Sequence, residues 1–325
     1  MIKTLKIYQT SQTNPYINLA TEKFLFDNVE KDTLILYLWQ NKNTVVIGKN
    51  QNPWKECLCD ELKNDGGFLA RRLSGGGAVY HDLGNLNFTF ICHTEDYDLN
   101  RNLEIIKTAC KYADIEVEIS GRNDILAGGK KFSGNAFYNS NGKSYHHGTV
   151  LISADMEKIK KYLTPSREKL VSKGVNSVSS RTVNLNTLKS DLTTEKMANL
   201  LILAAEKVLN LKAEKVIIND TQAINKTAEV FSSWEYLFGS TFPFSAKASD
   251  RFNWGEFQLL LNVKNGKISN AKFYTDSLDW EISEKVNNAL NGCLFNANDI
   301  EKQLKAELTE ETATDILNTI KEQIL

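Results

Sequence analysis

The chain has 325 residues, of which 42% are hydrophobic and 24% are charged, and its formal net charge is −1. These values are typical of an ordinary soluble globular protein with room for one large and one smaller domain. A near-neutral chain without a basic segment argues against a nucleic-acid partner. No apolar run reaches the length of a membrane span or of a signal peptide, so we expect no membrane association.

The cysteines argue for reduced thiols and a cytoplasmic location, because they are odd in number and scattered. They are Cys57, Cys59, Cys92, Cys110 and Cys293. Cys57 and Cys59 lie two residues apart, but no second Cys or His pair follows at ligand spacing. We therefore interpret both as helix residues and not as half of a zinc site.

Helices and strands alternate in the first part of the chain. Asn14-Pro15 predicts the capped start of a helix that ends near Asn28, because asparagine caps helices and proline favours the first helical position. Apolar runs and turn signals predict strands over 1–8, 34–39 and 45–47, followed by a helix over 54–63. Strands are then expected on both sides of 72–78 and over 86–91, where the residues alternate into and out of a sheet. A helix is expected over 103–112.

Residues 116–152 predict further strands, with Asn141-Gly142 as a hairpin turn. Helices are expected near 156–162 and 195–209. Runs of strands with irregularly placed helices predict an α+β fold with a mainly antiparallel sheet.

A domain boundary is expected where Gly, Ser, Thr and Pro gather, in residues 239–249. It separates a larger domain over 1–244 from a small α+β domain over 250–325, which has its own hairpin turn at Asn265-Gly266 and helical patterns from Trp280 onward. Two domains joined in this way are expected to shift relative to each other.

The most informative segment is Arg71-Arg72-Leu73-Ser74-Gly75-Gly76-Gly77. Glycines let backbone N–H groups approach an anion closely, and arginine forks match phosphate or carboxylate oxygens. A simple hairpin turn needs only one or two glycines, so we favour an anion-binding loop over an ordinary turn. The loop is not a Walker loop, which ends in Gly-Lys-Ser/Thr, and Tyr80 stands where the dinucleotide fingerprint needs glycine.

A second group of polar residues follows, with Asn123-Asp124, Lys130-Lys131 and His146-His147. A lysine beside small residues can reach an anion, and an Asn-Asp pair offers oxygen ligands for Mg²⁺. Taken singly, the lysines are more often a solvated turn and the histidines more often sheet residues. Their occurrence together with the Arg-Gly loop favours a functional interpretation.

These segments resemble the lipoate–protein ligase A family, and the motifs keep their order along nearly the whole chain. The resemblance is carried by residues 45–48, 51–57, 71–90, 121–124, 131–134, 146–149, 251–255 and 273–278. It implies a catalytic domain related to biotin ligases and class II synthetases, over residues 1–244. The small accessory domain of the longer ligases then follows, over residues 250–325.

The resemblance also implies a reaction in two steps. Lipoate and ATP first give lipoyl-adenylate (lipoyl-AMP) and pyrophosphate. The acyl group then passes to a lysine on a lipoyl domain of a 2-oxoacid dehydrogenase E2 subunit, or on glycine-cleavage H protein. A monomer without nucleic-acid or membrane partners is expected.

Site residues are carried over from the family motif by position. Lys131 matches the essential catalytic lysine, which can bridge the lipoate carboxylate and the α-phosphate. Asn123 and Asp124 are expected to place Mg²⁺ on the phosphates, with Asp124 as the metal ligand. The ATP and lipoyl-AMP positions are Arg72, Gly77, Ala78, Val79, Tyr80, Asn123, Asp124 and Lys131. The lipoate positions are Ser74, Gly75, His81, Lys131, Ala136, Gly148 and Thr149.

Three alternatives compete with the ligase. An octanoyl or lipoyl acyltransferase needs a nucleophilic thiol beside the lysine, and no cysteine lies between Cys110 and Cys293. Biotin ligase carries a Gly-Arg-Gly pattern that the glycine loop does not reproduce. A non-catalytic sensor or delivery protein is the third, and the joint presence of Arg72, Asp124 and Lys131 counts against it.

Overall fold

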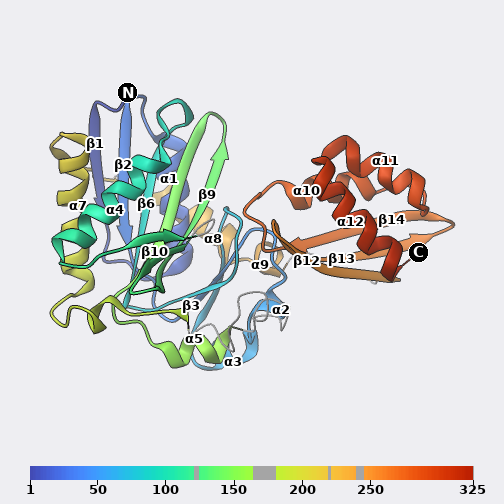
Figure 1. Ribbon diagram of the computed structural model, residues 1–325, viewed down its shortest axis with the longest axis horizontal. Helices are drawn as coiled ribbons and strands as arrows, with labels where there is room; N and C mark the ends of the chain where they lie inside the picture. Colours follow the sequence, from blue (N-terminus) through green and yellow to red (C-terminus); the bar gives the residue numbers. More distant parts are fainter. Residues whose placement is uncertain (121–123, 164–180, 219–220, 239–244, 325) are drawn as a thin grey trace.

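The computed structural model describes residues 1–120, 124–163, 181–218, 221–238 and 245–324 (Figure 1). Its largest feature is an eight-stranded sheet. In sheet order the strands are β11 (Ala213–Lys215), β1 (Thr4–Gln9), β2 (Thr33–Trp39), β6 (Asn85–His93), β10 (Lys143–Leu151), β9 (Lys130–Ser140), β8 (Asp124–Ala127) and β7 (Glu118–Ser120). β1 pairs in parallel with β11 and β2, and the other neighbours are antiparallel. The predicted α+β class with a mainly antiparallel sheet is confirmed, with a parallel edge added.

Helices cover both faces of this sheet (Figure 1). They are α4 (Leu99–Tyr112) and α7 (Thr194–Leu209) on one face, and α1 (Pro15–Asn28) and α8 (Thr221–Ser232) on the other. α1 begins as predicted, because the Asn14 side chain accepts the backbone N–H of Tyr16 at 2.9 Å. Leu36 packs toward α4 and α7, while Tyr37 packs toward α1. A sheet covered on both sides explains the uninterrupted apolar run of β2.

Residues 86–91 alternate between the two faces of the sheet as predicted, but neither face meets bulk water, because β6 is buried from Asn85 to Cys92. Its apolar residues, such as Phe88, pack below α4 and α7. Its polar residues do not face bulk water. Asn87 and Thr89 are at most 1% exposed and point into the protein interior on the side of α1.

A second, three-stranded sheet carries the glycine loop. Its order is β4 (Phe68–Arg71), β3 (Thr44–Ile47) and β5 (Val79–His81), with β3 parallel to β4 and antiparallel to β5. Residues 72–78 therefore cross from one side of β3 to the other. Both flanking strands were predicted.

The single helix predicted over 54–63 is wrong. Two short helices replace it, α2 (Pro53–Glu56) and α3 (Cys59–Asn64). Cys57 separates them in an extended conformation, with φ −142° and ψ 140°, and forms an isolated bridge with Leu163. Cys57 is thus not a helix residue, whereas Cys59 is. α5 (Met156–Tyr162) packs beside them, and short 3₁₀ turns occur at Thr94–Asp96 and Leu185–Thr187.

The accessory domain, which follows residue 244, contains a three-stranded antiparallel sheet with helices on one face (Figure 1). It comprises β12 (Ala246–Phe252), β13 (Gly255–Lys264), β14 (Lys267–Thr275), α10 (Ile282–Leu290), α11 (Ala297–Glu307) and α12 (Glu310–Gln323). The Asn265-Gly266 hairpin is confirmed, since both residues have positive φ, 51° and 71°. β12 was not predicted and extends across residue 250. The boundaries 1–244 and 250–325, and the relative shift of the two domains, stay predictions.

Among the described residues, no helix combines the length and apolar character that crossing a membrane requires.

Two buried histidines make the fold sensitive to acid. Burial lowers the pKa of His81 to about 3, and Arg72 and His147 add to this effect. Burial, with a smaller contribution from His147, also lowers the pKa of His146 to about 3. Between this value and the ordinary value of about 6.5, the unfolded chain binds more protons than the folded one. Stability therefore falls as the pH decreases through this window.

We predict that each of these histidines costs about 2 kcal/mol of stability when the pH falls from 7 to 5. The variant His146→Gln can still donate to Asn135, whose side-chain oxygen lies 2.8 Å from His146 Nε2. Its free energy of unfolding should therefore depend less on pH, by about 2 kcal/mol over this interval. Denaturant titrations of both proteins at pH 5 and 7 measure the difference. Equal pH dependence in the two would contradict the prediction.

Candidate active site

A cavity of about 210 Å³ lies where β5, β9 and β10 meet the glycine loop and the accessory domain. Apolar side chains from the core, such as Leu19, Trp39 and Val46, line it together with charged ones. The charged residues in its wall are Glu56, Arg72, Asp124, Lys131, Arg181, Arg251 and Asp276. Such a wall suits a ligand that is partly apolar and partly anionic.

Most of the predicted site residues line this cavity. They are Arg72, Gly77, Ala78, Val79, Tyr80, His81, Asp124, Lys131, Ala136, Gly148 and Thr149. Ser74 and Gly75 belong to the loop but are not in the cavity wall, because Ser74 faces His147 and Gly75 packs against the Ser277 backbone. Asn123 lies outside the described residues.

Sequence reasoning did not select several other residues of the wall. They include Trp39, Asn87, Asn135, Arg181, Arg251 and Asp276, whereas His147 belongs to the second polar group selected from the sequence. Asn87 and Asn135 stand within otherwise apolar strands, and a polar residue in a buried strand is a usable signal. Arg251 and Asp276 belong to a domain that sequence spacing alone does not bring to the cavity.

Lys131 lies on β9, and its ammonium group faces Asp124 on the neighbouring strand β8. The Lys131 Nζ and Asp124 Oδ1 atoms are 2.6 Å apart, and each side chain is 21% exposed. Arg181 Nη2 lies 3.8 Å from the other carboxylate oxygen. A Cβ atom at Gly134 would lie only 2.9 Å from Nζ, so glycine leaves the space that the lysine occupies. Asp124 thus balances the lysine until an anionic ligand competes for it.

Arg72 binds the glycine loop itself. Its guanidinium group donates to the carbonyls of Val46, Gly75 and Gly77 at 2.7–3.2 Å, and to Ser74 Oγ at 3.1 Å. Burial lowers the pKa of Arg72 to about 10, so the group stays charged near neutral pH. Arg72 therefore shapes the loop from inside, although it also lines the cavity.

Arg71 does not reach the cavity. It donates to the carbonyls of Gly48, Lys49 and Gln51 at 2.8–3.2 Å, and to Tyr236 and Leu237 of α9 (Trp234–Phe238). The expectation that both arginines present their charge to an anion is therefore wrong for Arg71. Its N–H groups instead bind the backbone of residues 48–51 and of residues 236–237.

The glycines of the loop allow the accessory domain to pack closely against it. The Gly76 backbone N–H donates to the Ser277 carbonyl at 2.8 Å. A Cβ atom at Gly75 would lie 2.3 Å from the same oxygen, and one at Gly48 would lie 2.2 Å from the Gly76 carbonyl oxygen. Close backbone packing explains why Gly75 is required, whereas Gly76 and Gly77 line the cavity and the Gly77 carbonyl accepts from Arg72.

A buried polar chain joins the loop to the sheet. Ser74 Oγ lies 2.7 Å from His147 Nε2, and His147 Nδ1 lies 2.8 Å from Glu22 Oε1. Thr89 donates to the same Glu22 oxygen at 2.7 Å. This is the order of a Ser–His–acid triad, but Ser74 is fully buried and its Oγ already accepts from Arg72. The chain therefore positions the loop and offers no nucleophile.

The described residues contain no group of three or more His, Cys, Asp or Glu side chains arranged to hold a metal ion. Asp124 is one of three carboxylates in the cavity wall, with Glu56 and Asp276, and it is the one beside Lys131. Mg²⁺ is commonly bound by one or two carboxylates together with the phosphates of a substrate. Asp124 fits that role and does not by itself form a metal site.

Family models match most of the chain. Residues 14–206 match the lipoyl protein ligase A/B catalytic domain, and residues 241–324 match the bacterial lipoate protein ligase C-terminus. The chain belongs to the lipoate–protein ligase A family. The family that the sequence motifs resemble is thus confirmed, and with it the assignment as a ligase.

Individual relatives agree with this result. A lipoate-protein ligase A from Psychrobacter cryohalolentis is 39% identical over 306 residues, which cover 91% of this chain and 90% of that protein. The crystal structure of P. falciparum LipL1 in complex with lipoate has a TM-score of 0.86 at 29% identity, covering 98% of this chain and all of that one. A lipoate-protein ligase A bound with ATP has a TM-score of 0.63 at 25% identity, covering 74% and 99%.

We predict that Arg72→Lys destabilises this ligase although it keeps the charge. Lysine cannot reproduce the fork, so buried carbonyls lose their donors at about 1–3 kcal/mol each. The free energy of unfolding should fall by about 3 kcal/mol in denaturant titrations. Arg101→Lys is the control, because the half-buried Arg101 donates to one backbone carbonyl, that of Asp96. Unchanged stability with weakened ATP binding would mean that Arg72 acts on the ligand and not on the loop.

Proposed function

We propose that this ligase activates lipoate with ATP to give lipoyl-AMP and pyrophosphate, and then transfers the lipoyl group to a lysine of an acceptor protein. The observation that carries the proposal is the Lys131–Asp124 pair in the wall of a cavity that is otherwise largely apolar. Lipoate has an apolar ring and chain and one carboxylate, which is the combination this wall suits. The LipL1 structure holds lipoate, and another relative is bound with ATP.

In the first step, a lipoate carboxylate oxygen attacks the α-phosphorus of ATP, and the bond to the leaving pyrophosphate breaks. Two anions must approach each other, so the reaction needs a fixed cation between them. Lys131 supplies it, because Asp124 and the open space at Gly134 hold the ammonium group in position. Among the described residues, Asp124 is the one that would hold Mg²⁺. Bound Mg²⁺ would offset negative charge on the phosphates of ATP.

In the second step, the amine of the acceptor lysine attacks the carbonyl carbon of the mixed anhydride, and AMP leaves. The anhydride is already activated, so the ligase needs no nucleophile of its own. We propose lipoyl domains of 2-oxoacid dehydrogenase E2 subunits, or glycine-cleavage H protein, as acceptors, and a monomeric enzyme. All five cysteines are free thiols, which supports a reducing compartment such as the cytoplasm.

We predict that Lys131→Ala abolishes most adenylation without unfolding the protein. Lipoate-dependent ATP–pyrophosphate exchange should fall about a hundredfold or more, the scale for losing one preorganised charge-stabilising donor. The thermal transition should change little, because Asp124 keeps Arg181 nearby. Lys130→Ala is the matched control, since Lys130 is the exposed neighbour on the same strand. Near-normal exchange by the Lys131 variant, with loss in the Lys130 variant, would move the role to Lys130.

A thioester mechanism is tested through the cysteines, none of which lines the cavity. Burial raises the pKa of Cys92 to about 11 and those of Cys110 and Cys293 to about 12, which keeps these thiols protonated. Replacing each of the five cysteines singly by alanine should leave lipoylation largely intact, apart from losses that follow reduced stability. A stable but inactive variant, or an acyl-enzyme detected by mass spectrometry, would contradict the adenylate mechanism.

A further inference from the structure

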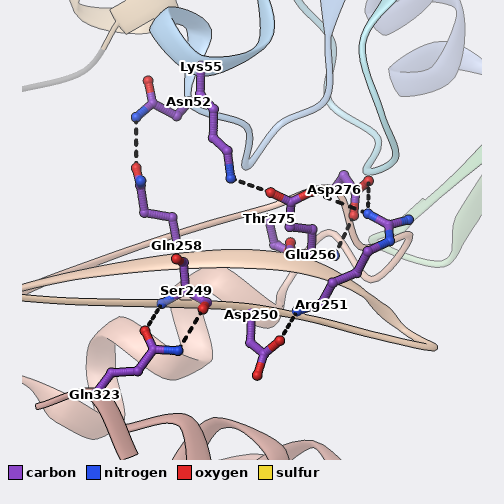
Figure 2. A network of polar contacts seen from close by, with 10 residues as sticks. All are labelled: Asn52, Lys55, Ser249, Asp250, Arg251, Glu256, Gln258, Thr275, Asp276 and Gln323. Atoms are coloured by element: carbon purple, nitrogen blue, oxygen red, sulfur yellow. Dashed lines mark hydrogen bonds and ion pairs between the residues drawn. The ribbon is translucent and has the colours of Figure 1, made fainter. Parts of the chain in front are cut away.

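Four charged side chains form a cluster where the accessory domain meets the catalytic domain (Figure 2). Lys55 of α2 pairs with Glu256 of β13, and the second carboxylate oxygen of Glu256 lies 3.3 Å from Arg251 Nη1. Asp276 Oδ2 lies 3.7 Å from the same nitrogen. These side chains are between 8% and 30% exposed. Two cations and two carboxylates therefore balance one another in a largely enclosed space.

Only one cation of this cluster faces the active-site cavity. Arg251 and Asp276 line that cavity together with Lys131, whereas Lys55 and Glu256 are not among its lining residues. Arg251 lies near the end of β12, directly opposite Glu256 in the strand pairing. The accessory domain thus contributes an arginine to the same enclosed volume that holds the candidate catalytic lysine.

Backbone contacts hold the arginine in this place. The Thr275 N–H donates to the Asn50 carbonyl at 2.8 Å, and the Asn50 side chain donates to the Trp280 carbonyl at 3.0 Å. The Ser277 carbonyl accepts from Gly76, as described above. In this structure these contacts hold the accessory domain against the glycine loop, and thereby place Arg251 beside the cavity before any ligand binds.

We propose that Arg251 is a phosphate-binding residue, contributed by the accessory domain to the nucleotide site, and that the Lys55–Glu256 pair holds it in register. The inference rests on the proposed function, which requires a polyphosphate in this cavity. A polyphosphate carries more negative charge than a carboxylate and offers paired oxygens to an arginine fork. Arg251 can therefore exchange its contacts with Glu256 and Asp276 for contacts with the phosphate chain.

The composition of the cluster supports this exchange. When Arg251 turns to the phosphates, Glu256 keeps Lys55 as its partner, and Asp276 Oδ1 keeps the Glu256 backbone N–H, which it accepts at 2.7 Å. Neither carboxylate is then left buried without a partner, which would be costly. Of the two cations, Lys55 joins the domains, whereas Arg251 lines the cavity.

The test compares Arg251→Met, Arg251→Lys and Lys55→Met in the full chain, each assayed for both half-reactions. Arg251→Met should raise the KM for ATP in lipoate-dependent ATP–pyrophosphate exchange by about 10- to 100-fold, as expected for loss of a charge-assisted contact. Its KM for lipoate, and its transfer rate from supplied lipoyl-AMP, should stay near the wild-type values. Arg251→Lys keeps the charge balance of the cluster and should give an intermediate KM.

Lys55→Met should raise the KM for ATP by at most about fivefold, because it removes one partly exposed ion pair that positions Arg251. Lys189→Met is the matched control, since Lys189 pairs with Asp114 at 2.9 Å within the catalytic domain, and it should leave the KM for ATP unchanged. Calorimetric binding of a non-hydrolysable ATP analogue gives the same comparison without turnover.

Two results would overturn the inference. One is a wild-type KM for ATP in a folded Arg251→Met protein. The other is an equal loss in both half-reactions for Arg251→Met and Arg251→Lys, which would mark a purely structural role. Failure of the proposed function is a separate result, because the wild-type enzyme would then show no lipoate-dependent exchange.

Discussion

The structure of this ligase depends on a buried arginine, Arg72, whose positive charge is stabilised by hydrogen bonds to backbone carbonyls. Arg72 is 6% exposed, and its fork binds the Gly75 and Gly77 carbonyls of the glycine loop and the Val46 carbonyl of the adjoining strand β3. A buried cation without such hydrogen-bond acceptors around it would be strongly unfavourable. The loop therefore has one shape that satisfies Arg72, and other parts of the site are built on that shape.

Three parts of the protein meet through this loop. On its inner side, Ser74 connects through His147 to Glu22 in the core. On its outer side, the Gly76 backbone N–H donates to the Ser277 carbonyl of the accessory domain. Its final residues form part of the cavity wall. A change in the shape of the loop would consequently alter its contacts with the sheet, the cavity wall and the domain interface together.

The sequence predicted those features whose cause is local. Asn14, Asn141 and Asn265 mark a helix cap and two hairpin turns at the expected places, because cap and turn chemistry acts over a few residues. Most of the site residues that the family motif identified also line the cavity. The motif could not separate an arginine that faces a ligand from one that binds backbone carbonyls, as Arg71 does. It could not anticipate the break at Cys57 either, because the partner strand residue is over a hundred positions away.

The cations of the cavity wall already have partners before any ligand enters. Among the described residues of this wall, Lys131 and Arg181 face Asp124, Arg251 faces Glu256 and Asp276, and Arg72 faces carbonyls. An anionic ligand therefore exchanges partners with groups that are already in position, and it does not have to gather flexible cations from solvent. Exchange of this kind gives modest binding energy but a high degree of preorganisation, and preorganised charge is what the transition state of the proposed adenylation requires.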